Sequence, residues 1–285
     1  MMSPPGTQLI VFQSLWGFAG DLDAAIAQAR HTGFDGLEAN LLHPAIRALA
    51  PSALHERLQA VGMGLVIELV SGGDYVPDLS VNPEQHLAEL EELLPQAEAL
   101  QPERITVITG SDSWSEDTQD RFLEAFLDLV DACRYPVSVE THRSRSLFNP
   151  WTIADRVQRH PRLRLTADLS HWCAVSERLM TPDLQPIQVI ADRVDHIHAR
   201  VGHAQGPSVS HPFAPEAADA LEAHRRCWRL FHQRQQARGQ LTTITPEFGP
   251  DGYMPTLPFT TTPLADLQEI NTAMAHWLVQ GALDH

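Results

Sequence analysis

The feature that most constrains the fold is an alternation, repeated eight times, between a short β-rich run and a longer segment of helical character. The candidate strands cover residues 9–16, 34–40, 64–70, 104–110, 137–142, 163–170, 194–201 and 242–249. Repetition of strand and helix indicates a parallel sheet covered by helices, and a count of eight favours a closed barrel over an open sheet. The sequence therefore predicts an α/β protein, a closed (β/α)8 TIM barrel that forms a single domain over residues 1–285.

Three segments between the strands carry clear helix signals. Residues 21–33 begin at Asp21, a candidate helix cap, and end at Gly33. Residues 83–100 have apolar positions at helical spacing, with Pro95 as a candidate kink, and residues 117–134 place Phe122 and Phe126 on one apolar stripe. No GxGxxG motif follows the first strand, which weakens the alternative of a dinucleotide-binding sheet.

Two connections are longer than a barrel needs. They are residues 202–220, after the seventh strand, and residues 249–263, after the eighth. Loops at the carboxyl ends of barrel strands build the active site in this fold. Both segments are therefore candidates for covering a substrate.

The charge balance narrows the set of partners. The chain has 20 Lys and Arg against 36 Asp and Glu, a formal charge of -16 at pH 7. Such a surface repels phosphate backbones and anionic membranes, so we expect neither nucleic acid nor membrane as a partner. The start of the chain lacks a signal-peptide pattern, and Cys133, Cys173 and Cys227 form no CxxC pair. A cytoplasmic location without a disulfide framework is the expectation.

Ionisable residues occur on the inner face of four consecutive strands. Side chains alternate between the two faces of a strand, so Glu140 lies opposite Val139 and points into the barrel. The same alternation turns Asp168, His198 and Glu247 inward, each near the carboxyl end of its strand. Three buried carboxylates repel one another unless a cation neutralises them. Carboxylate and imidazole ligands together suit one divalent ion, with Mn2+, Mg2+ or Co2+ favoured over Zn2+.

Four motifs carry a resemblance to a known family. The runs VSVETH, TADLSHW, VDHIHAR and ITPEFG, in this order and spacing, resemble the xylose isomerase-like TIM barrels grouped as sugar phosphate isomerases and epimerases. The resemblance extends from the first strand to the PFTTTPLADLQEIN segment. It implies that Glu140, Asp168, His198 and Glu247 hold the metal. It also implies that His171, the histidine of the DxxH motif, contacts substrate or a second metal.

The resemblance also implies a reaction class. In the keto-sugar epimerases of this family, the glutamates of strands five and eight, here Glu140 and Glu247, act as the acid/base pair. A metal-dependent isomerase or epimerase is therefore implied, acting through an enediolate on a small sugar or polyol-derived substrate; a homo-oligomer is left open. Those epimerases carry a Glu and an Arg where this chain has Ser146 and Ala204, so their sugar specificity does not transfer.

Six further residues are candidates for substrate contact: His171, Arg200, His142, His196, Glu68 and Trp16. Four of them have an alternative role. His196 shares a strand face with His198, so either histidine is a candidate for the metal ligand or His196 assists His198. The resemblance favours His198 as the ligand. Arg200 binds an anionic substrate group or pairs with an Asp, and His142 reaches substrate or orients the strand-five glutamate. Trp16 stacks on a sugar ring or packs at the barrel rim.

Other function classes remain open at this point. A metal-dependent lyase that dehydrates an inosose-like substrate uses the same chemistry. A phosphodiester hydrolase of the apurinic-endonuclease type shares the barrel, but it needs additional histidine ligands on the early strands. Those strands offer Glu38 and Glu68 and no inward histidine. A non-catalytic sugar-binding barrel has no need for a polarising metal, so the ligand set disfavours it.

Overall fold

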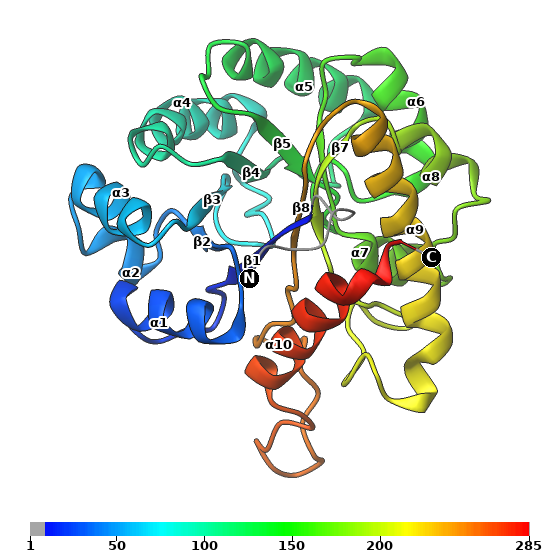
Figure 1. The fold of residues 1–285 in the computed structure, drawn as a ribbon. Coiled ribbons are helices and arrows are strands. Elements are labelled where there is room, and N and C mark those ends of the chain that lie inside the picture. The colour runs from blue at the N-terminus through cyan, green and yellow to red at the C-terminus, as the bar shows by residue number, and fades with distance from the viewer. Residues whose placement is uncertain (1–8, 285) are drawn as a thin grey trace.

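Eight parallel strands close into a barrel in chain order, with β8 hydrogen-bonded back to β1 (Figure 1). The computed structural model describes residues 9–284. The strands are β1 (Leu9–Ser14), β2 (Gly36–Asn40), β3 (Gly64–Val70), β4 (Arg104–Ile108), β5 (Val137–Glu140), β6 (Leu165–Ala167), β7 (Val194–His198) and β8 (Thr242–Thr245). The closed (β/α)8 barrel predicted from the sequence is confirmed.

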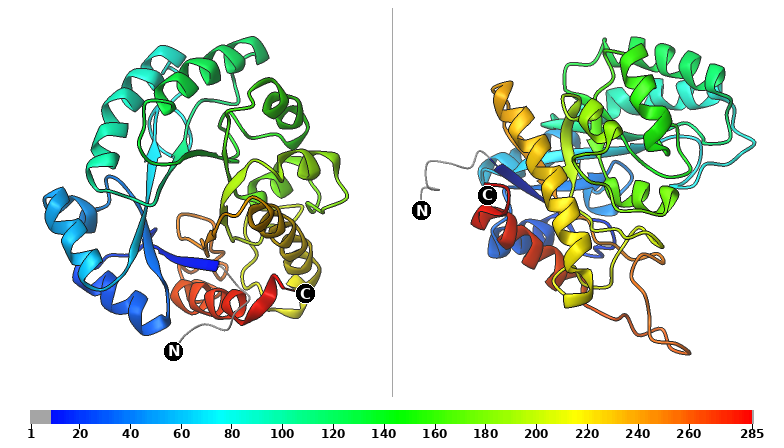
Figure 2. Two further views of the ribbon diagram at one scale, coloured as in Figure 1. Left: turned by 45° about the horizontal axis from the view of Figure 1, so that its top comes forward. Right: turned by 90° about the vertical axis from the view of Figure 1, so that its right-hand side faces the viewer.

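Helices form a ring around the strands (Figure 2, left). They are α1 (Leu22–Thr32), α2 (Pro44–Arg47), α3 (Pro51–Ala60), α4 (Pro83–Ala99), α5 (Glu116–Val130), α6 (Pro150–Arg159), α7 (Leu169–Ser176), α8 (Gln185–Ile190), α9 (Ala218–Ala237) and α10 (Leu267–Trp277), with a short 3-10 helix η1 (Pro215–Ala217) and a short π-helix η2 (Leu278–Ala282). Asp21 caps α1 by accepting a hydrogen bond from Ala24 N, and Gly33 ends it at φ 85°, as the sequence predicted. Helix α4 continues through Pro95.

The hydrophobic core lies between the strands and the helices. Every strand contributes an outward apolar side chain to it: Val11, Leu37, Ile67, Val107, Val139, Leu165, Ile197 and Ile244. The barrel interior instead combines a few apolar side chains, such as Phe12 and Ile108, with many buried polar ones. Thr166 Oγ1 lies 3.0 Å from Thr106 Oγ1 and 2.7 Å from Ser138 Oγ, which links three strands across the interior. Because barrel interiors are usually filled by branched apolar residues, this polar filling marks the inside of the barrel as a place for chemistry.

Six of the eight strands end earlier than the sequence suggested, and in β6 and β8 this affects the site. Strand β8 ends at Thr245 because Pro246 has no N–H to donate. Strand β6 ends at Ala167 because Asp168 caps helix α7, accepting a hydrogen bond of 2.8 Å from Ser170 N. Asp168 and Glu247 therefore lie just beyond their strands, at the carboxyl end of the barrel.

The two long connections differ from the expectation that both cover the site. Residues 255–264, in the connection after β8, are exposed and project away from the barrel (Figure 2, right). Only the part of this connection around Tyr253 returns to the barrel mouth. The first eight residues, in which the sequence shows no signal peptide, lie outside the described residues. Within 9–284, no helix is both long and apolar enough to cross a membrane.

Candidate functional site

The four residues predicted as metal ligands converge at the carboxyl end of the barrel. Glu140 ends β5 and His198 ends β7, while Asp168 directly follows β6 and Glu247 lies two residues after the end of β8. One ligand atom from each lies within 4.8 Å of those from the other three. All four side chains are buried. The four residues that strand alternation predicted to point inward are therefore brought together by the fold.

Two atoms at the centre of this group have no hydrogen-bond partner although both are buried: Glu140 Oε2 and His198 Nδ1. They lie 3.6 Å apart, and His198 Nδ1 is 3.1 Å from Glu247 Oε2. Leaving a buried polar atom unbonded costs about 1–3 kcal/mol, so such atoms call for a partner. A divalent cation accepts lone pairs from all these atoms at once. The residues present therefore fit a metal of the kind that the sequence implies.

The electrostatics of the centre also favour a cation. Burial raises the pKa of Glu140 to about 7, and the carboxylates of Glu247 and Asp168 add to the shift against the opposing effect of His198. Burial and the charges of Glu140 and Glu247 raise the pKa of Glu68 to about 8. Burial acts to lower the pKa of His198, but the surrounding carboxylates raise it well above its ordinary value. Burial is the main cause of the two carboxyl shifts, and the negative charge around the centre adds to them and causes the shift of His198.

Arg200 supplies one positive charge at the edge of the centre. Its guanidinium forms an ion pair with Asp168 and donates hydrogen bonds to His171 Nε2 at 2.8 Å and Ser170 Oγ at 3.0 Å. Because His171 Nε2 accepts, the proton of this neutral ring is on Nδ1. Arg200 also lines the cavity above the centre. Of the two roles predicted for Arg200, the structure shows the pairing with an Asp. The side chain also faces the place that a substrate would occupy.

Three aromatic side chains from separate loops cover the mouth of the barrel. Trp16 follows β1, Tyr75 follows β3 and Tyr253 follows β8, and the Trp16 ring lies 5.0 Å from that of Tyr253 and 5.9 Å from that of Tyr75. Trp16 Nε1 donates to Asp251 Oδ2 at 2.9 Å. A cavity of about 20 Å³ remains beneath this cover, close to the size of one water. A sugar-sized molecule therefore needs the cover to open.

The other candidates for substrate contact occupy different depths. Trp16, Glu68 and His142 line the cavity. The pKa of His142 is lowered to about 3 by burial, so this ring is neutral, and it lies 3.9 Å from the ring of His171. His171 is fully buried behind Arg200. His196 is also fully buried, below the centre, and its ring nitrogens are hydrogen-bonded to other side chains.

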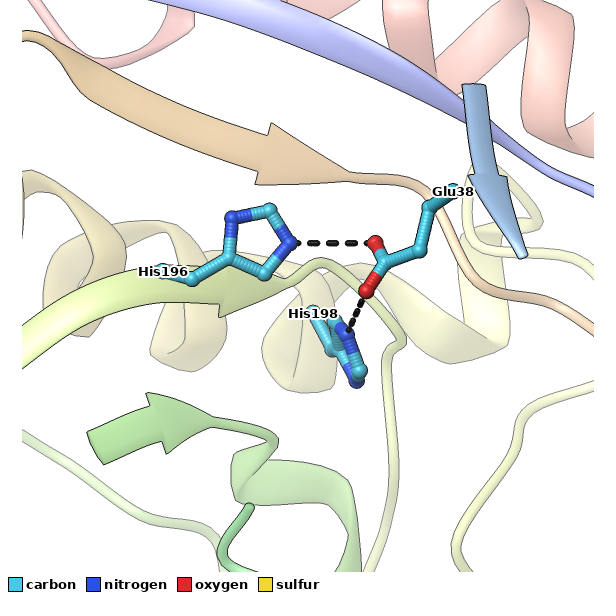
Figure 3. Close-up of side chains that lie close together, drawn as sticks. All are labelled: Glu38, His196 and His198. Atoms are coloured by element: carbon cyan, nitrogen blue, oxygen red, sulfur yellow. Dashed lines mark hydrogen bonds and ion pairs between the residues drawn. The ribbon is translucent and has the colours of Figure 1, made fainter. Parts of the chain in front are cut away.

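Sequence reasoning gave no site role to Glu38, Tyr75 or Tyr253. Glu38 points into the barrel from β2 and contacts both histidines of β7 (Figure 3). Strand alternation marks it as inward, but nothing local indicates that it reaches a histidine some 160 residues away. Tyr75 and Tyr253 lie in irregular loops, where no periodicity indicates direction. None of residues 202–220 lines the cavity, and their role as a substrate cover remains a prediction.

The comparisons with known proteins give structural neighbours only. No protein-family model and no curated protein sequence matches the chain. An L-ribulose 3-epimerase aligns at a TM-score of 0.64 and 15% identity, over 96% of this chain and 95% of that one. A xylose isomerase-like TIM barrel protein from Mycobacterium smegmatis, in complex with magnesium, aligns at 0.61 and 16%, over 96% and 97%.

A probable 3-DHS dehydratase from Bacillus anthracis aligns at a TM-score of 0.60 and 16% identity, over 94% of this chain and 98% of that one. These alignments span almost the full length of every chain compared, and such low identity establishes the fold alone. The chain has the fold of the xylose isomerase-like TIM barrel proteins.

Proposed function

We propose that the protein is a metal-dependent isomerase or epimerase of a small sugar or polyol-derived substrate. The observation that carries the proposal is the pair Glu140 and Glu247, whose Oε2 atoms lie 3.6 Å and 3.1 Å from the unpartnered Nδ1 of His198. Two carboxylates beside one cation site can serve both to hold the ion and to move a proton at an adjacent carbon. A structural neighbour named as a sugar 3-epimerase supports this choice.

The residues of the centre have two roles, metal binding and proton transfer. Glu140, Asp168, His198 and Glu247 would hold one divalent ion, which when bound polarises a substrate carbonyl and offsets negative charge. Glu140 is buried and lines the cavity, which places its carboxylate to take or return a proton at a substrate carbon. We assign the same role on the other side of the substrate to Glu247. The closed aromatic cover keeps water from the reacting carbon.

Substrate contacts beyond the metal come from the cavity lining. Arg200 and the neutral His142 supply polar groups, and Trp16 and Tyr253 supply flat apolar faces. This mixture suits a polyhydroxylated molecule, whose hydroxyls need hydrogen bonds and whose C–H faces stack on aromatic rings. Which sugar is bound depends on the open state of the cover.

A lyase is the second candidate, and the fold neighbour named as a probable dehydratase favours it. Its first step is the same removal of a proton next to a carbonyl. The two reactions differ in the next step, since a lyase expels water while an epimerase returns the proton. The mass of the product therefore distinguishes a lyase from an epimerase. A phosphodiester hydrolase is less well supported, because the net charge of -16 disfavours a nucleic acid.

Incubation in deuterium oxide tests the proposal. Protein loaded with Mn2+ is mixed with a panel of ketoses, aldoses and inososes, and deuterium at carbon is measured by mass spectrometry. We expect exchange with at least one of them, suppressed by Glu247→Gln and retained by Glu91→Gln, a matched change at an exposed helix position. Cleavage of an abasic-site oligonucleotide without exchange into any sugar would overturn the proposal, and exchange with loss of water would favour the lyase.

A further inference from the structure

Below the proposed metal centre lies a second cluster of ionisable groups, which shares His198 with the centre and adds two residues that the proposed chemistry does not use. It consists of Glu38 from β2 with His196 and His198 from β7, and all three side chains are buried (Figure 3). Strands β2 and β7 are not neighbours, since β1 and β8 lie between them. Glu38 therefore reaches across the interior of the barrel to the two histidines.

The contacts fix which nitrogen of each histidine ring donates to Glu38. Glu38 Oε1 lies 3.0 Å from His198 Nε2, and Glu38 Oε2 lies 3.0 Å from His196 Nε2. A carboxylate only accepts hydrogen bonds, so both histidines donate from Nε2. The remaining nitrogen of His198, Nδ1, points toward Glu140 and Glu247 and accepts no hydrogen bond. It is the atom available to a metal.

The carboxylate of Glu38 is itself held in place. His196, which donates to its second oxygen, has its own Nδ1 2.8 Å from Thr243 Oγ1 on β8. A chain of hydrogen bonds thus runs from β8 through His196 to Glu38 and on to His198. Because both oxygens of Glu38 have partners, the side chain cannot rotate to release His198 without breaking a buried hydrogen bond elsewhere.

We propose that Glu38 is a positioning residue that keeps the proton of His198 on Nε2 and directs Nδ1 at the metal. The proposal rests on the proposed function in one respect only, namely that a divalent ion binds at the four-residue centre. A carboxylate behind a metal-binding histidine fixes the ring orientation and increases the electron density that the ring offers to the ion. Glu38 would do this without touching metal or substrate.

The variant Glu38→Gln tests this role. The amide has one acceptor oxygen for two N–H donors, and its own NH2 group then faces a histidine nitrogen. Two donors, the amide NH2 and the Nε2–H of His198, then face each other. A shift of the His198 proton to Nδ1 removes this clash, but a proton on Nδ1 competes with the metal. We expect the affinity for Mn2+, measured by isothermal titration calorimetry, to fall about 10- to 100-fold. His232→Gln changes a buried histidine bonded to Thr242 outside both clusters and should keep the wild-type affinity.

Nitrogen-15 NMR of the histidine rings supplies a readout that a merely structural role would not move. In Zn2+-loaded wild type we expect a proton on Nε2 of His198 and none on Nδ1, and in Glu38→Gln a signal from Nδ1–H. Unchanged affinity and an unchanged ring signal in the variant would overturn the role of Glu38. If the variant does not fold, the wild-type spectrum alone still tests the proposal. A His198 ring that carries no proton on Nε2 would overturn the role of Glu38. Wild type that binds no Mn2+ would instead overturn the proposed function.

Discussion

At the scale of single residues, the centre contains two buried polar atoms that have no hydrogen-bond partner. Glu140 Oε2 and His198 Nδ1 are buried and unbonded, while Asp168 is already paired with Arg200. A ligand that binds only the folded state raises its stability by mass action, by about 2.7 kcal/mol at a hundredfold excess over its dissociation constant. Metal binding at these residues is therefore measurable as thermal stability.

The first prediction concerns Asp168→Asn, which keeps the side-chain shape and removes the charge. Mn2+ should raise the melting temperature of the wild type, and a chelator should reverse the increase. The variant should show little response to either, because it loses a ligand. Asp128→Asn, at an exposed position on α5, is the control and should respond as the wild type does. Equal shifts in wild type and Asp168→Asn would place the ion elsewhere.

The sequence predicted some residues of the centre better than others. Glu140 and His198 lie within regular strands, where alternation of faces decides direction. Glu38 obeys the same rule, but its partners come from a strand far along the chain, so its role needed the closed barrel. Tyr75 and Tyr253 come from loops whose paths depend on tertiary contacts, such as the four loop carbonyls that accept from the buried Arg145. No local pattern records such contacts.

At the scale of elements, helix α10 holds the segment that follows β8. Asn271 on α10 accepts a hydrogen bond from Phe248 N and donates one to Phe248 O, both at 2.9 Å. Phe248 is the residue next to Glu247. The position of that carboxylate therefore depends on a helix outside the barrel. The sequence predicted the strands and helices from periodicity, but not this contact between them.

The second prediction is that Asn271→Asp weakens this attachment. The carboxylate still accepts from Phe248 N but cannot donate to Phe248 O, so a donor is lost and two oxygens repel. We expect a loss of about 1–3 kcal/mol in unfolding free energy and a weaker affinity for Mn2+, by urea denaturation and calorimetry. Asn149→Asp is the matched control, because Asn149 caps α6 through its oxygen alone and Asp serves there as well. Similar effects of both changes would contradict the account.

At the scale of the whole molecule, the eightfold repeat predicted the closed barrel because each strand–helix unit buries its apolar face only against its neighbours. The interior of that barrel concentrates negative charge. In the metal-free chain, Glu140 and Glu68 have pKa values raised to about 7 and about 8, with burial as the largest cause, while unfolded glutamates titrate near 4.5. Folding is thus linked to proton binding near neutral pH.

The third prediction follows from the sign of this linkage. Between about pH 7 and about pH 8, the folded chain keeps a proton on Glu68 and a fraction of one on Glu140 that the unfolded chain has lost, so stability falls as pH rises. The raised pKa of His198 acts in the same direction, and histidines with a lowered pKa, such as His142, oppose it only below about pH 6.5. The metal-free melting temperature should therefore fall across this window, and fall less in Glu68→Gln. A level or rising temperature would contradict the charge distribution described.

The most direct test of the account is the position of the ion itself. Crystals soaked in Mn2+ and measured near the manganese absorption edge should show one anomalous peak inside the barrel. The peak should lie roughly 2.0–2.3 Å from His198 Nδ1 and from carboxylate oxygens of Glu140, Asp168 and Glu247. A peak on the Nε2 side of His198, beside Glu38, or no peak within the barrel at saturating Mn2+, would contradict the assignment of the metal centre.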